Sequence, residues 1–235
     1  MTAETAVAVL TTLSPEQLHA VLAGDPVRAA PWIRAAALYG LPEAQVRWGR
    51  MLLEGAGVSA DPATALAWFT GAAEAGDPEA QNMVGRCREN GWGAPIDLAE
   101  AAIWYTRAAE AGHAWAQYNL GHLYLNGQGV RRDAAEALVW YRRAAEQGHS
   151  RAMNLVGRCC EQGWGTDTDP AAARDWYRRS AEGGYFRGQY NYASLLAGEG
   201  RHDQAAAWFD RALAGAPSQS RALMARATED GAERC

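Results

Sequence analysis

The chain repeats itself every 36 residues, and this period constrains its fold more than any single motif does. Glycine and tryptophan keep the step through most of the sequence, at Gly49, Gly85, Gly121 and Gly157 and at Trp32, Trp68, Trp104, Trp140 and Trp176. A fixed period of this length predicts a stack of similar units, each of which buries its apolar face against its neighbours. Proteins built in this way usually present an extended surface to a partner.

Residues 77–112 show what one unit contains. Asp77-Pro78 is a helix start, because Asp caps unpaired backbone N–H groups and Pro suits the first helical position. The Asn-Gly-Trp-Gly sequence at 90–93 ends that helix, and Asp97 caps a second one. Apolar residues follow helical spacing in both halves, at Ala80, Met83, Val84 and Cys87 and then at Ala101, Trp104, Tyr105, Ala108 and Ala109. We therefore expect each unit to be a pair of short antiparallel helices and the fold class to be all-α.

The same period divides the chain. Residues 1–30 are expected to form a helical cap, in which Ser14-Pro15-Glu16-Gln17 resembles a capping box. A repeat array covers 31–216, and a C-terminal capping helix and tail follow at 217–235. Within the array we expect a half repeat at 31–40, full units at 41–76, 77–112, 113–148 and 149–184, and an atypical unit at 185–216. Terminal units differ from the others because one of their faces meets water.

Charge and composition argue against several classes of protein. The formal net charge of −5 is unlike that of a general nucleic-acid binder. No apolar run approaches the roughly 18 residues of a membrane span, and the N-terminus lacks the pattern of a secretion signal, so we expect no membrane insertion. Cysteines at Cys87, Cys159, Cys160 and Cys235 form no disulfide framework or metal signature. We therefore expect a reduced, cytoplasmic protein with no metal and no cofactor.

The repeat resembles the Sel-1-like repeat, a relative of the tetratricopeptide repeat with a longer loop between its helices. The best match is Ala-Gln-Tyr-Asn-Leu-Gly at 116–121 with Gly-Gln-Gly-Val at 127–130, followed by Asp133 and by Trp140-Tyr141. The resemblance spans 32–216, and the last unit is more similar to an ordinary tetratricopeptide repeat. It implies a right-handed α/α superhelix, a solenoid whose first helices line a concave groove. Members of the family mostly act as adaptors that assemble complexes.

If the tetratricopeptide alignment holds, the groove-facing positions of the first helices are candidates for partner binding. They are Arg50 in the first full unit, Asn82 and Arg86 in the second, Tyr118 and His122 in the third, Asn154 and Arg158 in the fourth, and Tyr190 in the atypical unit. Asn can pair with a peptide backbone, and Arg can hold a carboxylate through two parallel hydrogen bonds. The expected partner is thus a protein or peptide with acidic groups. The alternative is that these side chains are solvated or brace the adjacent helix.

Three further sets of residues have a simpler interpretation. Trp92 and Trp164, in Gly-Trp-Gly turns, are expected to pack over a helix rather than anchor a partner. His113 and His149 are expected to cap a turn rather than bind metal. A row of arginines on the second helices is expected to pair with nearby glutamates on a solvated face: Arg107, Arg142, Arg143, Arg178, Arg179 and Arg211, with Glu110, Glu146 and Glu182.

These features favour a non-catalytic protein–protein interaction scaffold. An enzyme is the rival class, but no Ser-His-Asp, Cys-His, phosphate-loop or paired-carboxylate arrangement stands out. Some secreted, cysteine-rich relatives have been associated with penicillin binding or β-lactam hydrolysis. This chain departs from them, because it lacks cysteines paired within each repeat. Self-association through the end or groove of the solenoid is a further alternative, and it can coexist with partner binding.

Overall fold

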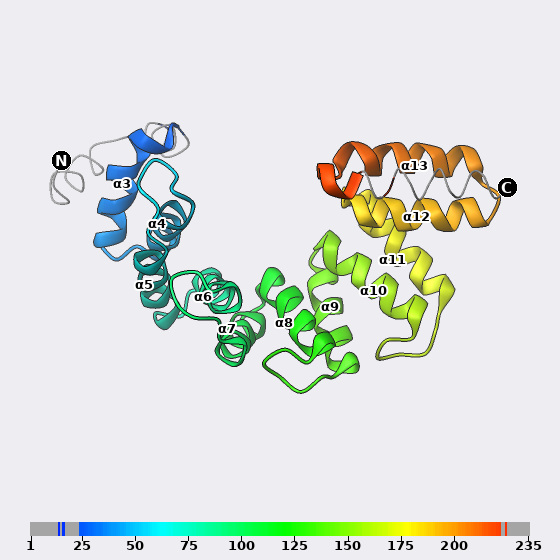
Figure 1. Cartoon of the computed structure of the whole chain (residues 1–235), viewed down its shortest axis with the longest axis horizontal. Coiled ribbons are helices and arrows are strands. Elements are labelled where there is room, and N and C mark those ends of the chain that lie inside the picture. The colour runs from blue at the N-terminus through cyan, green and yellow to red at the C-terminus, as the bar shows by residue number, and fades with distance from the viewer. Residues whose placement is uncertain (1–13, 15, 17–23, 222–223, 225–235) are drawn as a thin grey trace. The chain divides into compact units, whose positions relative to one another are not determined.

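The computed structural model describes residues 14, 16, 24–221 and 224, and in this part of the chain there are helices and turns but no strand. Helices in this part of the chain (Figure 1) include α3 (Pro26–Leu38), α4 (Pro42–Glu54), α5 (Pro62–Glu74), α6 (Pro78–Asn90), α7 (Leu98–Glu110), α8 (Ala114–Asn126), α9 (Ala134–Glu146), α10 (Ser150–Gln162), α11 (Pro170–Glu182), α12 (Phe186–Gly198) and α13 (His202–Gly215). The expected all-α fold class, built from helix pairs, is confirmed.

The second helices of the pairs begin at the aspartates that the sequence predicts as caps. Each of these carboxylates accepts a hydrogen bond of 2.9–3.0 Å from a backbone N–H in the first turn of its helix: Asp61 in α5, Asp97 in α7, Asp133 in α9 and Asp169 in α11. Such a cap satisfies one of the N–H groups that a helix start leaves unpaired. The residue at which each second helix begins is therefore set by its own capping aspartate.

The loop after a first helix packs closely on the preceding helix pair. In the second full repeat Gly91 ends α6 with φ +73°, a left-handed conformation that favours glycine. Two residues later, Gly93 lies so near the start of α5 that an added Cβ atom would stand 2.2 Å from the Pro62 carbonyl oxygen. Gly93 is left-handed as well, with φ +78°, so both glycines suit the turn and Gly93 also permits the close approach of neighbouring pairs.

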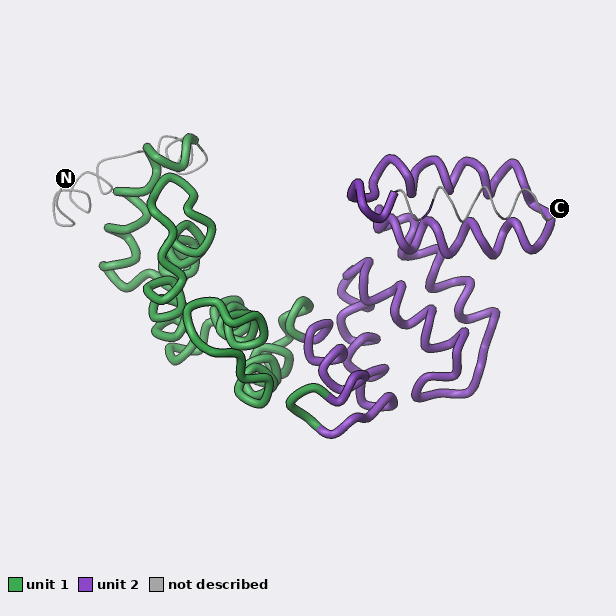
Figure 2. Tube along the Cα trace, in the orientation of Figure 1, with its two compact units in different colours: residues 1–116, 128–130 green, residues 117–127, 131–235 purple. Residues whose placement is uncertain are grey.

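The chain divides into two compact units (Figure 2). Unit 1 comprises residues 1–116 and 128–130 and contains α3–α7. Unit 2 comprises residues 117–127 and 131–235 and contains α9–α13, and the division runs through α8. Within each unit the two helices of a pair pack together, and the second helix of one pair packs on the first helix of the next.

In both units an aromatic ring of the second helix lies against a glycine of the first. The ring–glycine pairs are Phe69 with Gly49 and Tyr105 with Gly85 in unit 1, and Tyr141 with Gly121 and Tyr177 with Gly157 in unit 2. All four rings are buried, and a Cβ atom added to any of these glycines would stand 2.5–2.7 Å from the ring. The glycine register of the sequence thus marks where the helices of a pair come closest.

The ends of the array differ from the expected division. Asp25 accepts a hydrogen bond from the Val27 N–H at 3.1 Å and begins α3 there, so the boundary expected at residue 30 falls inside this helix and Pro31 lies within it. Residues 218–221 are helical. Most of the caps expected at 1–30 and 217–235, including two residues of the expected capping box, lies outside the described residues.

Candidate partner-binding faces

In unit 1 the first helices α4 and α6 line a pocket of about 390 Å³. Its lining residues are Glu43, Val46, Arg47, Arg50, Asp77 and Glu79. Arg50, a predicted site residue, is exposed there. The first-helix face of unit 1 is therefore hollowed and lined by charges of both signs.

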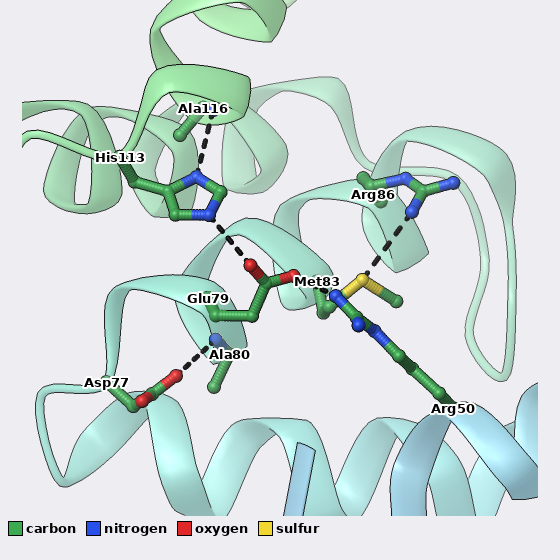
Figure 3. Close-up of polar contacts among 8 residues, drawn as sticks. All are labelled: Arg50, Asp77, Glu79, Ala80, Met83, Arg86, His113 and Ala116. Atoms are coloured by element: carbon green, nitrogen blue, oxygen red, sulfur yellow. Dashed lines mark hydrogen bonds and ion pairs between the residues drawn. The ribbon is translucent and has the colours of Figure 1, made fainter. Parts of the chain in front are cut away.

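The Arg50 guanidinium is neutralised by a carboxylate of the next first helix (Figure 3). It donates to Glu79, whose other oxygen accepts a 2.9 Å hydrogen bond from Nε2 of His113. Nδ1 of His113 accepts the Ala116 N–H at 3.2 Å, so the imidazole caps α8 and carries its hydrogen on Nε2. The hydrogen bond from His113, with the charge of Arg50, holds the pKa of the Glu79 carboxyl below its usual range although burial opposes this.

Asn82 and Arg86 in unit 1 are less available than the sequence suggests. Asn82 is only 3% exposed. The Arg86 guanidinium carbon lies 5.1 Å from the centroid of the Trp92 ring, and Nη1 lies 3.5 Å from the Met83 sulfur. The positive charge of Arg86 is thus placed on the π face of Trp92, where it stabilises the Gly-Trp-Gly turn.

Asn154 and Arg158 in unit 2 repeat this arrangement. Asn154 is 4% exposed and accepts a 2.8 Å hydrogen bond from the Asn191 amide of α12, so it braces the adjacent helix. Arg158 is exposed, with its guanidinium 4.9 Å from the centroid of Trp164. For Asn154, the interpretation that the side chain braces a neighbouring helix is the one that agrees with the structure.

Unit 2 gathers aromatic rings on α8 in the slots where α6 and α10 carry Asn and Arg. The Tyr118 ring lies 4.6 Å from His122 and 4.9 Å from His149, and His122 lies 5.6 Å from Tyr141. Burial lowers the pKa of His122, and the charge of Arg158 lowers it further. Burial also raises the pKa of Tyr118. His122 and Tyr118 are therefore neutral near pH 7, and their half-buried rings can contact a ligand.

The remaining interpretations from the sequence have mixed outcomes. Trp92 and Trp164 pack against the core of their own units, as expected. His113 and His149 cap α8 and α10 through Nδ1, also as expected. Tyr190 is half-buried, with its ring 5.3 Å from Phe209.

The second-helix arginines correct one expectation. Arg178 pairs with Glu182 at 3.0 Å, but four of these arginines lie over a tryptophan ring three residues earlier in their own helix. These stacked pairs are Arg107 on Trp104, Arg143 on Trp140, Arg179 on Trp176 and Arg211 on Trp208, at 4.1–4.7 Å. The spacing of three residues brings the guanidinium over the indole, so ring contact replaces much of the expected ion pairing.

Two features of the first helices cannot be predicted by considering one residue at a time. Arg151 and Arg187 occupy the slot that holds Glu79 in unit 1, so the first-helix face changes charge along the array. Tyr105 donates to Glu89 and Tyr177 donates to Glu161, whereas the Tyr141 hydroxyl has no hydrogen-bond partner among the described residues. Aligning the repeats at 36 residues reveals both features. It places Arg151 and Arg187 at the position of Glu79, and Leu125 at the position of Glu89 and Glu161.

Within the described residues, no helix is long and apolar enough to cross a membrane, and no group of three or more His, Cys, Asp or Glu is placed to hold a metal ion. Paired helices repeated at a fixed step, with uniform core positions and variable first-helix positions, define a helical-repeat protein of the α-solenoid class.

The chain belongs to the Sel1 repeat family, whose sequence model matches residues 42–77, 78–113, 116–149 and 150–185. The predicted family and solenoid fold are thereby confirmed. A search of the curated proteins finds no relative of the chain.

Solved structures of Sel1 repeat proteins share the fold. A Sel1 repeat protein from Oxalobacter formigenes is 29% identical, with a TM-score of 0.78, and the match covers 90% of this chain and 98% of that one. The protective antigen c5321 of uropathogenic Escherichia coli, which has the same type of fold, is 30% identical, with a TM-score of 0.74 and 88% of this chain covered. The match covers only 45% of the E. coli protein. The immunity protein Pa5087 of Pseudomonas aeruginosa, 17% identical with a TM-score of 0.53 and coverage of 74% and 66%, is similar in fold alone.

Proposed function

We propose that this chain is a non-catalytic scaffold that binds a partner protein or peptide through the first-helix faces of its repeats. One observation carries the proposal: core-facing slots are nearly uniform, whereas first-helix slots vary and several of them are accessible. The repeat position of Asn82 and Asn154, which are buried, is taken in other repeats by the half-buried Tyr118 and Tyr190. One helical turn further along, Arg50 and Arg158 are exposed. Variable, accessible side chains on a repeated framework are what recognition of a specific partner requires.

The cysteines support a reducing compartment for this activity. Cys87, Cys159 and Cys160 are buried and unpaired, which suits a protein that functions where thiols stay reduced. We therefore retain the cytoplasm as the proposed location.

Site-specific photocrosslinking tests which face meets the partner. The photoreactive amino acid p-benzoylphenylalanine is placed at Tyr118 or Tyr190 on first helices, and at Ile103 or Val139 on second helices as controls. The control residues share one repeat slot and are 54% and 42% exposed, so they report on an accessible face of the same array. We expect a discrete adduct from native extract at the tyrosine positions and none at the controls. Adducts confined to Ile103 and Val139 would contradict the proposal.

Self-association is a second candidate, favoured by apolar side chains near the start of the described array. Tyr39 is 72% exposed and Leu41 is 48% exposed, beside the exposed Leu38. Exposed apolar residues grouped in this way are typical of contact surfaces. Sedimentation equilibrium should then show a dimer that Tyr39→Ser/Leu41→Ser converts to a monomer, whereas a wild-type monomer would reject this candidate.

A further inference from the structure

The first helices of unit 2 carry a net positive charge that the second helices do not share. α8, α10 and α12 hold Arg151, Arg158 and Arg187 but only one acid, Glu161. That acid is already engaged, because it accepts a 2.9 Å hydrogen bond from the Tyr177 hydroxyl of α11. The chain as a whole has a net charge of −5, so this positive face is a local feature and not a property of the surface in general.

Unit 1 shows what the same slots look like when the charges are balanced internally. There Glu79 accepts hydrogen bonds from Arg50 and His113. The slot of Glu79 is occupied in unit 2 by Arg151 and Arg187, both exposed. The carboxylate that neutralises an arginine in unit 1 is thus replaced in unit 2 by further positive charge.

The Tyr141 hydroxyl adds an unsatisfied donor at the same place. Its side chain is fully buried, yet the hydroxyl has no partner in the described part of the chain. Tyr105 and Tyr177, in the same slot of other repeats, donate to Glu89 and Glu161. In this repeat Leu125 stands where the other two have glutamate.

The first full repeat shows that the ring itself needs no hydroxyl. It has Phe69 in the tyrosine slot and Leu53 in the glutamate slot, so there the absence of the acid is matched by the absence of the donor. Only the repeat with Tyr141 keeps the donor and lacks the acceptor. A buried hydroxyl without a partner is unfavourable, and a ligand carboxylate would supply the missing acceptor.

We propose that the α8–α10–α12 face of unit 2 binds an acidic peptide segment of the partner, with one carboxylate beside Arg158 and the Tyr141 hydroxyl. This rests on the proposed function and names the chemistry of its ligand. Arg151 and Arg158 are seven residues apart on α10, close to two helical turns, and so lie on one face about 10 Å apart. A peptide in the polyproline II conformation has three residues per turn and rises about 3.1 Å per residue, so acidic side chains three residues apart lie on one face, about 9 Å apart, and reach both arginines.

The rings of the face favour a peptide over a bare anion. Tyr118 lies within the electrostatic influence of Arg151 and Arg187, and His122 within that of Arg158; both rings are half-buried and so leave room for side-chain contact. Aromatic and arginine side chains together are characteristic of the centres of protein interfaces.

A binding titration with the full chain tests the proposal. The probe is a fluorescein-labelled peptide of repeating Glu-Ala-Ser sequence, and its Gln-Ala-Ser counterpart is the uncharged comparison; fluorescence anisotropy gives the affinities. We expect the Glu peptide to bind and the Gln peptide to bind at least about tenfold more weakly, as loss of charge-assisted hydrogen bonds implies. Equal binding of the two peptides, or no binding of the Glu peptide, would overturn the proposal.

Paired arginine variants place the site on this face. Arg151→Gln/Arg187→Gln should weaken Glu-peptide binding by about tenfold or more, since two charged donors are removed. Arg131→Gln/Arg142→Gln removes the same charge from the loop and second helix of unit 2, and should change the affinity less than about twofold. Equal weakening by both pairs would show attraction to charge alone and would sink the site.

Two substitutions at the unpaired hydroxyl separate binding from folding. Leu125→Glu supplies the acceptor that repeats with Glu89 and Glu161 possess, so we expect the free protein to be stabilised and the peptide to be excluded. Tyr141→Phe should leave the protein folded, as Phe69 does in its repeat, and weaken binding severalfold. A folded Leu125→Glu variant with full peptide affinity would contradict the proposal. First-helix crosslinks to a partner without an acidic segment would contradict it too, while leaving the proposed function intact.

Discussion

The Tyr105 hydroxyl of α7 donates a 2.6 Å hydrogen bond to the Glu89 carboxylate of α6, joining the two helices of one pair. Burial raises the pKa of Tyr105, and the neighbouring Glu89 carboxylate raises it further, so the phenol remains a donor across the physiological range. The ring of the same tyrosine fills the space over Gly85. A single side chain thus supplies both the apolar packing and the polar connection within the pair.

Removing the tyrosine hydroxyl at this repeat position should destabilise the protein only where that hydroxyl has a hydrogen-bond acceptor. Tyr105→Phe loses a hydrogen bond to a charged group and leaves Glu89 partly buried, at a cost of about 1.5–3 kcal/mol. Tyr141→Phe removes a hydroxyl that has no partner in the described structure, and should cost less than about 0.5 kcal/mol or stabilise. Urea denaturation of both variants measures the difference. Equal losses would show that the ring environment, and not the hydrogen bond, sets the cost.

The glycines beneath the rings should respond to alanine in the opposite way from an exposed helical glycine. In Gly85→Ala the new Cβ atom would stand 2.6 Å from the Tyr105 ring, so we expect a loss of about 1–3 kcal/mol from overpacking. Gly71 of α5 has nothing within 4 Å of the corresponding position, so Gly71→Ala should gain up to about 1 kcal/mol from helix propensity. Thermal denaturation of the two variants gives the signs. Stabilisation by Gly85→Ala would mean that the helices are not held this closely.

The fold is predictable from the sequence because local rules decide it. An aspartate such as Asp97 caps its helix with atoms three residues away, and Gly91 ends one through its own backbone. The 36-residue period predicted that these pairs stack, and the family resemblance added the expectation of a right-handed superhelix.

The site is less predictable because its contacts join positions far apart in the chain. The Asn154 amide is held by Asn191, 37 residues later, and Arg86 lies over Trp92 only because the turn folds back. Spacing along a helix placed these residues on first helices correctly. Helical spacing could not show which neighbouring residue each of these side chains would contact.

Acid should weaken the protein partly through Glu79. Because the pKa of Glu79 is lower in the folded chain than its ordinary value of about 4.3, the unfolded state binds more protons between the two values. The stability from this group is therefore present above the ordinary pKa and is lost as the pH falls toward the lower, folded value. The free energy of unfolding of Glu79→Gln should fall less steeply than that of wild type from about pH 5 to 3. The exposed Glu110→Gln variant is the control, and identical slopes for wild type and Glu79→Gln would refute the role of this carboxylate.

The buried thiols should be inert in the native protein. Burial raises the pKa of Cys87 to about 11 and that of Cys159 to about 12. At pH 8 the thiolate fraction of such a group is more than about 100-fold below that of an ordinary cysteine, and the thiolate is the reacting species. In a Cys160→Ser/Cys235→Ser background, which leaves Cys87 and Cys159, labelling by a disulfide reagent should be that much slower than for a model thiol, and full in denaturant. Native labelling at the rate of a model thiol would contradict this burial.

The measurement that tests partner binding by the first-helix face most directly is affinity capture from native extract with two matched charge reversals. Arg86→Glu/Arg158→Glu replaces two first-helix arginines, each of which lies over a tryptophan ring. Arg107→Glu/Arg143→Glu removes two that lie over tryptophans on second helices, so both variants lose the same kind of contact. With folding of both checked by circular dichroism, we expect the partner of wild type to be lost by the first-helix variant and kept by the second-helix variant. Retention by the first variant with loss by the second would contradict binding at the first-helix face.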